Sequence, residues 1–123
     1  MRTRKYDADD KDLSSLLPLN HADFHILLSL TDADRHGYAI MQHVRELTEG
    51  SLKLGPGTLY TSIKRLLDAT LIEESDERPD TDMDDQRRRY YRLTGFGRRV
   101  ATAEAERFAR LVQVVKARKL VKV

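Results

Sequence analysis

The sequence has no cysteine and no tryptophan. Without cysteine the chain cannot be held together by disulfide bonds. Without tryptophan it cannot sandwich a flat ligand between indole rings. No long apolar run follows the basic residues at positions 2, 4 and 5, so we expect no signal peptide, no membrane span and a cytoplasmic location. A mass of 14.2 kDa predicts one domain with a modest core, which dimerisation would help to stabilise.

Positive and negative charges nearly cancel over the whole chain, which has a net charge of +2. Two segments are exceptions. Residues 73–86 contain eight acidic residues and one basic residue, whereas residues 87–123 contain twelve basic residues and two acidic ones. Because residues 13–72 are close to neutral, attraction to phosphate has to come from the segment after residue 86 or from a second subunit.

Residues 56–69 are predicted to form a helix with one apolar face. Pro56 suits the first helical position because its φ is already fixed and its missing N–H would be unpaired there, and Gly55 can serve as the N-cap. The apolar stripe is formed by Leu59, Ile63, Leu66 and Leu67. The residues outside it have side chains that can reach base edges and phosphate oxygens in a major groove: Thr58, Tyr60, Thr61, Ser62, Lys64 and Arg65. Alone, such a pattern is typical of any surface helix, so the elements that surround this helix must decide whether it binds DNA.

Capping residues and apolar spacing predict the other elements. Asn20 can cap a first helix, and a polar turn at 32–37 separates it from a second helix that ends near residues 49–50. Residues 71–93 are predicted to form a hairpin with a long polar tip. Thr94 can cap a last helix of about two dozen residues.

Three helices, a hairpin and a terminal helix, in this order, are typical of a winged helix-turn-helix whose third helix enters the major groove. The predicted fold is mostly α with a two-stranded β wing and a long C-terminal dimerisation helix. We expect a flexible extension at 1–18, a DNA-binding domain at 19–93, the dimerisation helix at 94–119 and a tail at 120–123. The apolar stripe of the last helix is expected to meet a partner subunit, with packing on its own core as the alternative. This stripe consists of Ala101, Ala105, Phe108, Leu111, Val112 and Val115.

Four motifs make the chain resemble the PadR-type transcriptional regulators. They are His36-Gly37-Tyr38-Ala39-Ile40, Pro56-Gly57-Thr58-Leu59-Tyr60, the stretch from Leu66 to Ile72, and Tyr91-Arg92-Leu93-Thr94 followed by Gly97. Each motif is weak alone, but four in this order and spacing are specific. The resemblance covers roughly residues 19–115.

The resemblance implies a homodimeric repressor of the subgroup with a single C-terminal helix, which forms the dimer contact. It implies that Tyr60 and Lys64 contact the DNA backbone or groove, and that Gly37 and Tyr38 belong to the positioning helix, where Tyr38 packs. It also implies that a small molecule, often aromatic, relieves repression. The residues that could line such a site, for which helix packing is the competing interpretation, are Phe24, Phe108, Leu111 and Val112.

Three residues depart from the family pattern. Thr70 stands where glycine is usual, which leaves open where the reading helix stops. Thr61 stands where proline is frequent and Gly55 where serine is common, and both changes bear on operator preference.

The acidic hairpin tip is a problem for DNA binding because phosphate would repel it. Our hypothesis is that the tip points away from DNA while the returning strand supplies the cations that face it. These cations are Arg87, Arg88, Arg89 and Arg92. An operator-binding protein with this arrangement would lose part of its salt dependence when the arginines are removed.

Two patterns are reminiscent of metal sites but are incomplete. Residues 80–84 have aspartates at the 1, 3, 5 spacing of a calcium loop, but the loop's glycine and bidentate glutamate are missing. His21 and His25 have helical i, i+4 spacing, but Ala22 stands where a zinc protease needs glutamate. We therefore expect no metal site.

No phosphate loop or nucleophile elbow occurs, so we expect no enzyme and no cofactor. The expected partners are a double-stranded operator, a second copy of the chain and a small aromatic effector, with no membrane. The alternative function is a winged-helix protein-interaction module that does not bind DNA, which the acidic segment 73–86 favours.

Overall fold

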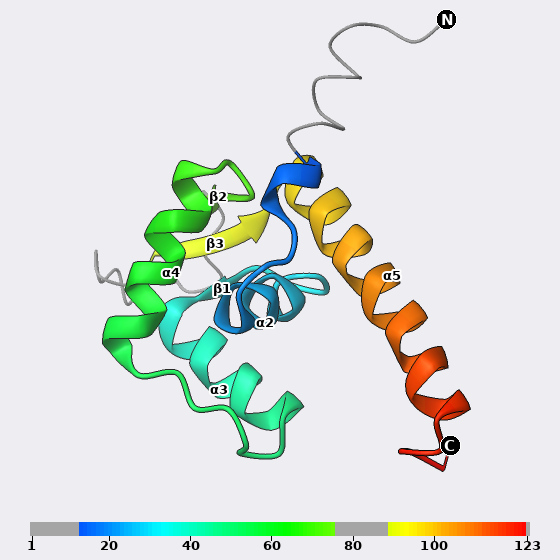
Figure 1. Cartoon of the computed structure of the whole chain (residues 1–123). Helices are drawn as coiled ribbons and strands as arrows, with labels where there is room; N and C mark the ends of the chain where they lie inside the picture. Colours follow the sequence, from blue (N-terminus) through cyan, green and yellow to red (C-terminus); the bar gives the residue numbers. More distant parts are fainter. Residues whose placement is uncertain (1–12, 76–88, 123) are drawn as a thin grey trace, which may run out of the picture.

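The computed structural model describes residues 13–75 and 89–122. Residues 13–16 are helical. The elements that follow are α2 (His21–Ser29), β1 (Arg35–His36), α3 (Gly37–Leu47), α4 (Pro56–Asp68), β2 (Ile72–Ser75), β3 (Tyr90–Leu93) and α5 (Gly95–Ala117), as Figure 1 shows. The predicted fold class, mostly α with a small wing and a long terminal helix, is confirmed.

The helices begin where the capping residues predicted. The Asn20 side chain accepts a hydrogen bond from the Asp23 N–H at 2.8 Å, and the Thr94 hydroxyl accepts one from the Gly97 N–H at 2.9 Å. Pro56 is the first residue of α4 and Gly55 its N-cap. Each cap satisfies or avoids an N–H that has no partner within the helix.

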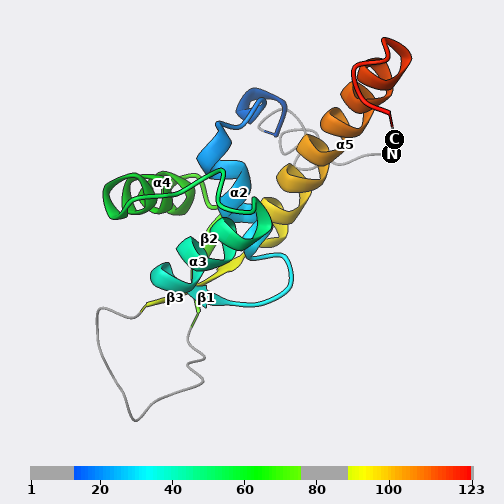
Figure 2. The same cartoon turned by 90° about the horizontal axis from the view of Figure 1, so that it is seen from below.

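The sheet has three antiparallel strands in the order β1-β3-β2, one more than predicted. The extra strand lies in the segment predicted as a polar turn, and it pairs Arg35 with Tyr91 and His36 with Tyr90. Two residues are too few to show the alternation that identifies a strand, so only the paired partner reveals it. In the second view, β1 and β3 lie together below α3 (Figure 2).

The core lies between the sheet, helices α2 to α4 and the first half of α5. Its fully buried apolar side chains include Ile26, Leu27, Ile40, Val44, Leu59, Leu66, Leu71, Ile72 and Val100. Leu13, Leu16 and Leu17 pack against it. Residues 13–18 therefore belong to the folded unit, which corrects the prediction of a flexible extension over 1–18; residues 1–12 lie outside the described part.

The end of α4 is joined tightly to the start of α5. Thr70 has φ = 60° and follows the last turn of α4, and the Leu71 N–H donates to the Leu66 carbonyl at 2.9 Å. This is the Schellman arrangement that usually ends on glycine. The Thr94 hydroxyl donates to the Thr70 carbonyl at 2.6 Å, and a Cβ built on Gly97 would lie 1.9 Å from the Leu71 carbonyl oxygen. Only glycine at position 97 allows this approach.

Candidate nucleic-acid interface

Helix α4 buries one face and exposes the other. Leu59, Ile63 and Leu66 are at most 2% exposed. The opposite face, together with the first turn, is exposed and carries Thr58, Tyr60, Thr61 and Lys64. The Lys64 side chain is 79% exposed and makes only a 3.4 Å contact with Asp68. The outer face therefore offers two hydroxyls, a phenol and an exposed cation, which are groups that can contact DNA.

Of the residues predicted for this outer face, one is buried and another is exposed but paired with α2. Ser62 is 1% exposed, so the prediction that its side chain lies on the exposed face is wrong. The Arg65 guanidinium donates to both carboxylate oxygens of Asp23, at 2.9 and 3.0 Å, and to the Ser62 hydroxyl at 3.1 Å. Asp23 is buried, and its hydrogen bonds raise the pKa of Arg65. Arg65 thus ties α4 to α2 rather than projecting freely.

Tyr60 links the outer face of α4 to the sheet. A Cβ on Gly37 would lie 2.6 Å from the Tyr60 hydroxyl, so this glycine makes room for the phenol. The neighbouring His36 ring meets the Tyr90 ring edge to face, with centroids 5.2 Å apart. Burial raises the pKa of Tyr91, and the nearby charges of Glu74 and Tyr60 raise it further. The start of β3 therefore lies close to Tyr60.

The arginines of the returning strand are engaged in ion pairs within the wing. Arg89 contacts Glu74 at 3.2 Å, and Arg92 contacts Glu73 at 2.9 Å. All four side chains are more than 40% exposed. Arg87 and Arg88, which were predicted to contact DNA, lie outside the described residues, as does the acidic tip with its calcium-like spacing.

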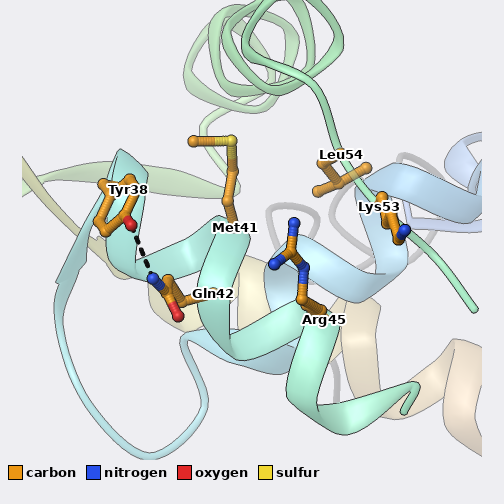
Figure 3. Close-up of a pocket in the computed structure, with 6 residues that line it drawn as sticks. All are labelled: Tyr38, Met41, Gln42, Arg45, Lys53 and Leu54. Atoms are coloured by element: carbon orange, nitrogen blue, oxygen red, sulfur yellow. Dashed lines mark hydrogen bonds between the residues drawn. The ribbon is translucent and has the colours of Figure 1, made fainter. Parts of the chain in front are cut away.

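Helix α3 and the connection to α4 border a pocket of about 100 Å³ that the sequence did not predict (Figure 3). Tyr38 is 61% exposed, which corrects its expected packing role, and its hydroxyl accepts a hydrogen bond from the Gln42 amide at 2.8 Å. Arg45 and Lys53 also line the pocket. Gln42 and Arg45 follow Tyr38 by four and seven positions on α3, a spacing that places the three side chains on one side of the helix and could have indicated this site.

The predicted dimerisation stripe of α5 divides into two parts. Ala101 is 8% exposed and belongs to the core of its own subunit, which corrects its assignment to the dimer contact. Further along, Leu111, Val112 and Val114 are about half exposed, at 52%, 47% and 48%. In both views the last turns of α5 extend beyond the other helices (Figures 1 and 2). Ala105 is exposed, whereas Phe108 and Val115 are half-buried.

The aromatic residues proposed to line an effector site lie against each other. The Phe24 and Phe108 rings meet edge to face, with centroids 5.1 Å apart and an interplanar angle of 79°. This contact joins α2 to α5. Val112 follows Phe108 by one helical turn and is exposed.

His21 and His25 are stacked edge to face on α2, with centroids 4.5 Å apart. Among the described residues, no three histidine, aspartate, glutamate or cysteine side chains are grouped closely enough to bind a metal. Within residues 13–75 and 89–122, no helix has both the length and the apolar character needed to cross a membrane.

Comparison with protein families gives a match to the transcriptional regulator PadR-like family over residues 26–103. Uncharacterized protein X of Lysinibacillus sphaericus is 30% identical over 97 residues, which are 77% of this chain and 84% of that protein. An uncharacterized 37.1 kDa protein in transposon TN4556 of Streptomyces fradiae is 34% identical over 92 residues. The match covers 75% of this chain but 24% of that protein, so this chain spans about a quarter of that relative.

Solved structures share the fold. A PadR family transcription regulator from Clostridium difficile R20291 has 26% sequence identity and a TM-score of 0.66, with 80% of this chain and 97% of that chain covered. Bacillus subtilis PadR in complex with operator DNA has 21% identity and a TM-score of 0.57, with 70% and 47% covered. Since the family match extends over more than half of the residues, this chain belongs to the PadR-like family of transcriptional regulators.

Proposed function

We propose that the chain is a sequence-specific DNA-binding repressor that acts as a homodimer. The observation that carries this proposal is the outer face of α4, where Tyr60, Thr61 and Lys64 are exposed beside a first turn that is also exposed. A side chain on this face can reach base edges, while the buried face fixes the helix to the core. Membership of a regulator family, and the solved operator complex of B. subtilis PadR, support the same function.

Dimerisation through the far half of α5 would place two copies of α4 on one face of a duplex. The apolar side chains of Leu111, Val112 and Val114 are about half exposed and form the surface that a second copy would cover. Two recognition helices about 34 Å apart read half-sites one duplex turn apart. A symmetric dimer of this kind recognises a pseudo-palindromic operator. Occupation of such a site obstructs transcription.

Fluorescence anisotropy tests this function with a duplex from the regulator's own promoter region and a scrambled duplex, at about 50 and 200 mM salt. We expect tighter binding to the promoter duplex and weaker binding to both at the higher salt. Lys64→Ala should weaken binding to both duplexes, and Thr61→Val should reduce the preference for the promoter. Lys122→Ala is the matched control, because Lys122 lies beyond α5. Equal affinity for the two duplexes would contradict sequence-specific binding.

Relief of repression by a small aromatic effector is the second part of the proposal. The Phe24 and Phe108 rings form one of the contacts between α2 and α5, and exposed Val112 lies one turn beyond. An aromatic ligand that replaced one ring in this pair would change how α5 is set against α2. Titration with aromatic acids should raise the melting temperature and lower operator affinity, and Phe108→Leu should abolish both effects. Effects that survive in this variant would place the effector elsewhere.

A protein-interaction module that does not bind DNA is the competing function. The pairing of Arg89 and Arg92 with carboxylates favours it, because these cations are already neutralised. No salt-dependent binding to either duplex, with an intact dimer, would select this alternative.

A further inference from the structure

Two cross-strand ion pairs of the wing lie in different surroundings. The register of β2 and β3 sets Glu73 opposite Arg92 and Glu74 opposite Tyr91. Successive side chains of a strand point to opposite faces of the sheet, so Glu73 and Glu74 lie on opposite faces. Tyr91 is 6% exposed and belongs to the core, and therefore Glu74 shares the face that the helices cover.

The Glu74–Arg89 pair lies beside the proposed reading face. Arg89 immediately precedes Tyr90, which pairs with His36, and His36 is followed by Gly37. The Tyr60 hydroxyl also lies against Gly37, next to the strand that pairs with β3. A duplex lying against the outer face of α4 would thus bring its phosphates close to Arg89.

The bond between Glu74 and Arg89 is weak enough to be exchanged. The two side chains are 47% and 59% exposed, and their atoms are 3.2 Å apart. Exposed pairs of this kind contribute about 0.2–1 kcal/mol. Arg89 makes one hydrogen bond to Glu74, whereas a DNA phosphodiester, which carries the same single negative charge, offers two free oxygens to which a guanidinium can donate in a bidentate manner.

We propose that Glu74 competes with DNA phosphate for the guanidinium of Arg89. This inference rests on the proposed DNA-binding function and extends it to a residue that restrains binding. When no DNA is bound, Glu74 neutralises Arg89 beside the reading face, so the wing adds little long-range attraction for the phosphate backbone. When a duplex docks, Arg89 exchanges the carboxylate for phosphate. Because phosphate contacts carry no sequence information, Glu74 limits retention on bulk DNA and leaves base reading to α4.

The test is the affinity of Glu74→Gln for the promoter duplex and for the scrambled duplex at low salt. We expect both affinities to rise by the same factor, about two- to fivefold, which corresponds to the free energy of an exposed pair. Glu73→Gln is the matched control, because it removes the same charge from the neighbouring position on the opposite face. Glu73→Gln also frees a cation, Arg92, but on the other face of the sheet. Equal effects of the two variants would overturn the proposal, since the effect would then not depend on the position of the Glu74–Arg89 pair.

A double-mutant cycle separates competition from direct repulsion. In an Arg89→Gln background, Glu74→Gln should have no further effect, because there is no guanidinium left to release. A persisting increase would overturn the proposal, since Glu74 would then act on phosphate directly. If the unmodified protein binds neither duplex, the proposed function itself fails. If it binds selectively but Glu74→Gln behaves as Glu73→Gln does, only the competition by Glu74 is refuted.

Discussion

The two halves of α5 contain similar residues but have different neighbours. In the first half, Val100 and Glu104 are completely buried against the rest of the subunit. In the second half, Leu111 and Val114 are about half exposed. The first half is therefore part of the domain core, whereas the second half is an apolar surface without a described covering element. The comparison shows that one continuous helix can contribute its first half to a core and present an exposed apolar surface along its second half.

The largest effect on stability is expected at Glu104, the buried carboxylate in the first half of α5. Glu104 accepts hydrogen bonds from the Leu19 N–H at 2.9 Å and from Arg107 at 2.6 Å. Glu104→Ala should lower the free energy of unfolding by about 3 kcal/mol, because it leaves both donors without their acceptor. Urea unfolding at neutral pH measures this change. Glu106→Ala is the control, since Glu106 is exposed on the same helix, and similar losses in both variants would contradict the assignment.

The same carboxylate gives a prediction for the pH dependence of stability. Hydrogen bonding from Arg107 lowers the pKa of Glu104 in the folded state. The stabilisation is therefore complete above the pKa of an unfolded glutamate, about 4.3, and is lost as the pH falls through the lower folded pKa. The difference in unfolding free energy between the unmodified protein and Glu104→Gln should shrink on acidification in this range. A difference that does not depend on pH would be inconsistent with this shift.

The second half of α5 should control assembly rather than folding. Leu111→Glu is expected to weaken self-association by at least about tenfold, because a buried leucine contributes about 1.5–3 kcal/mol and a buried unpaired charge adds a cost. Sedimentation equilibrium measures association, and thermal unfolding of the dilute protein should change little. Gln113→Glu adds the same charge on another face of the same turn and should leave association intact. Dissociation by both variants, or by neither, would refute the assignment.

Removal of the N-cap at the start of α5 should have a smaller effect on stability. Thr94 accepts from the Gly97 N–H and donates to the Thr70 carbonyl. Thr94→Ala is expected to cost about 1 kcal/mol of stability, as is usual for the loss of an N-cap. Thr102→Ala is the control within α5, where the exposed threonine should be replaced without loss. Chemical unfolding of the two variants would show the difference.

The smallest expected effect is a gain in stability at Thr70. This β-branched residue has φ = 60°, a region that glycine occupies more readily. Thr70→Gly should raise the free energy of unfolding by about 0.5–1 kcal/mol. Thr102→Gly, in the middle of α5, should have the opposite sign, because glycine weakens a helix interior. A loss of stability at both positions would show that the Thr70 side chain compensates for its backbone conformation.

Local signals were sufficient to predict most of the fold. The side chains of Asn20 and Thr94 cap helices through bonds to residues three positions away, so the sequence contains the whole interaction. The strand at Arg35–His36 could not be predicted in this way, since its pairing with β3 joins residues more than fifty positions apart. The end of α4 was left open because Thr70 replaces the usual glycine, yet the same helix stop forms.

The site was predicted less completely than the fold because burial depends on tertiary packing. Helical spacing placed Ser62 outside the apolar stripe, but α4 packs against α2 on that side and Ser62 is buried. Arg65 stays exposed, yet its guanidinium is bonded to Asp23 of α2, which its spacing along α4 could not predict. Ala101 was assigned to the dimer contact for the converse reason, since its own core reaches that far along α5. The exposure of Tyr38 depends in the same way on how α3 is placed.

The close approach of Gly97 to the Leu71 carbonyl connects the first turn of α5 directly to the segment that follows α4. Because the two backbones are in direct contact, with no side chain between them, the first turn of α5 cannot move toward Leu71 without displacing the segment that follows α4. About 30 Å of helix separates Gly97 from Ala117 at the far end of α5. Between these ends, Glu104 and Phe108 hold the helix to Leu19 and Phe24, so a displacement of the far end acts on these contacts as well as on the segment at Leu71. A molecule bound at the far end of α5 is therefore connected to α4 through one continuous helix and its backbone contact with Leu71.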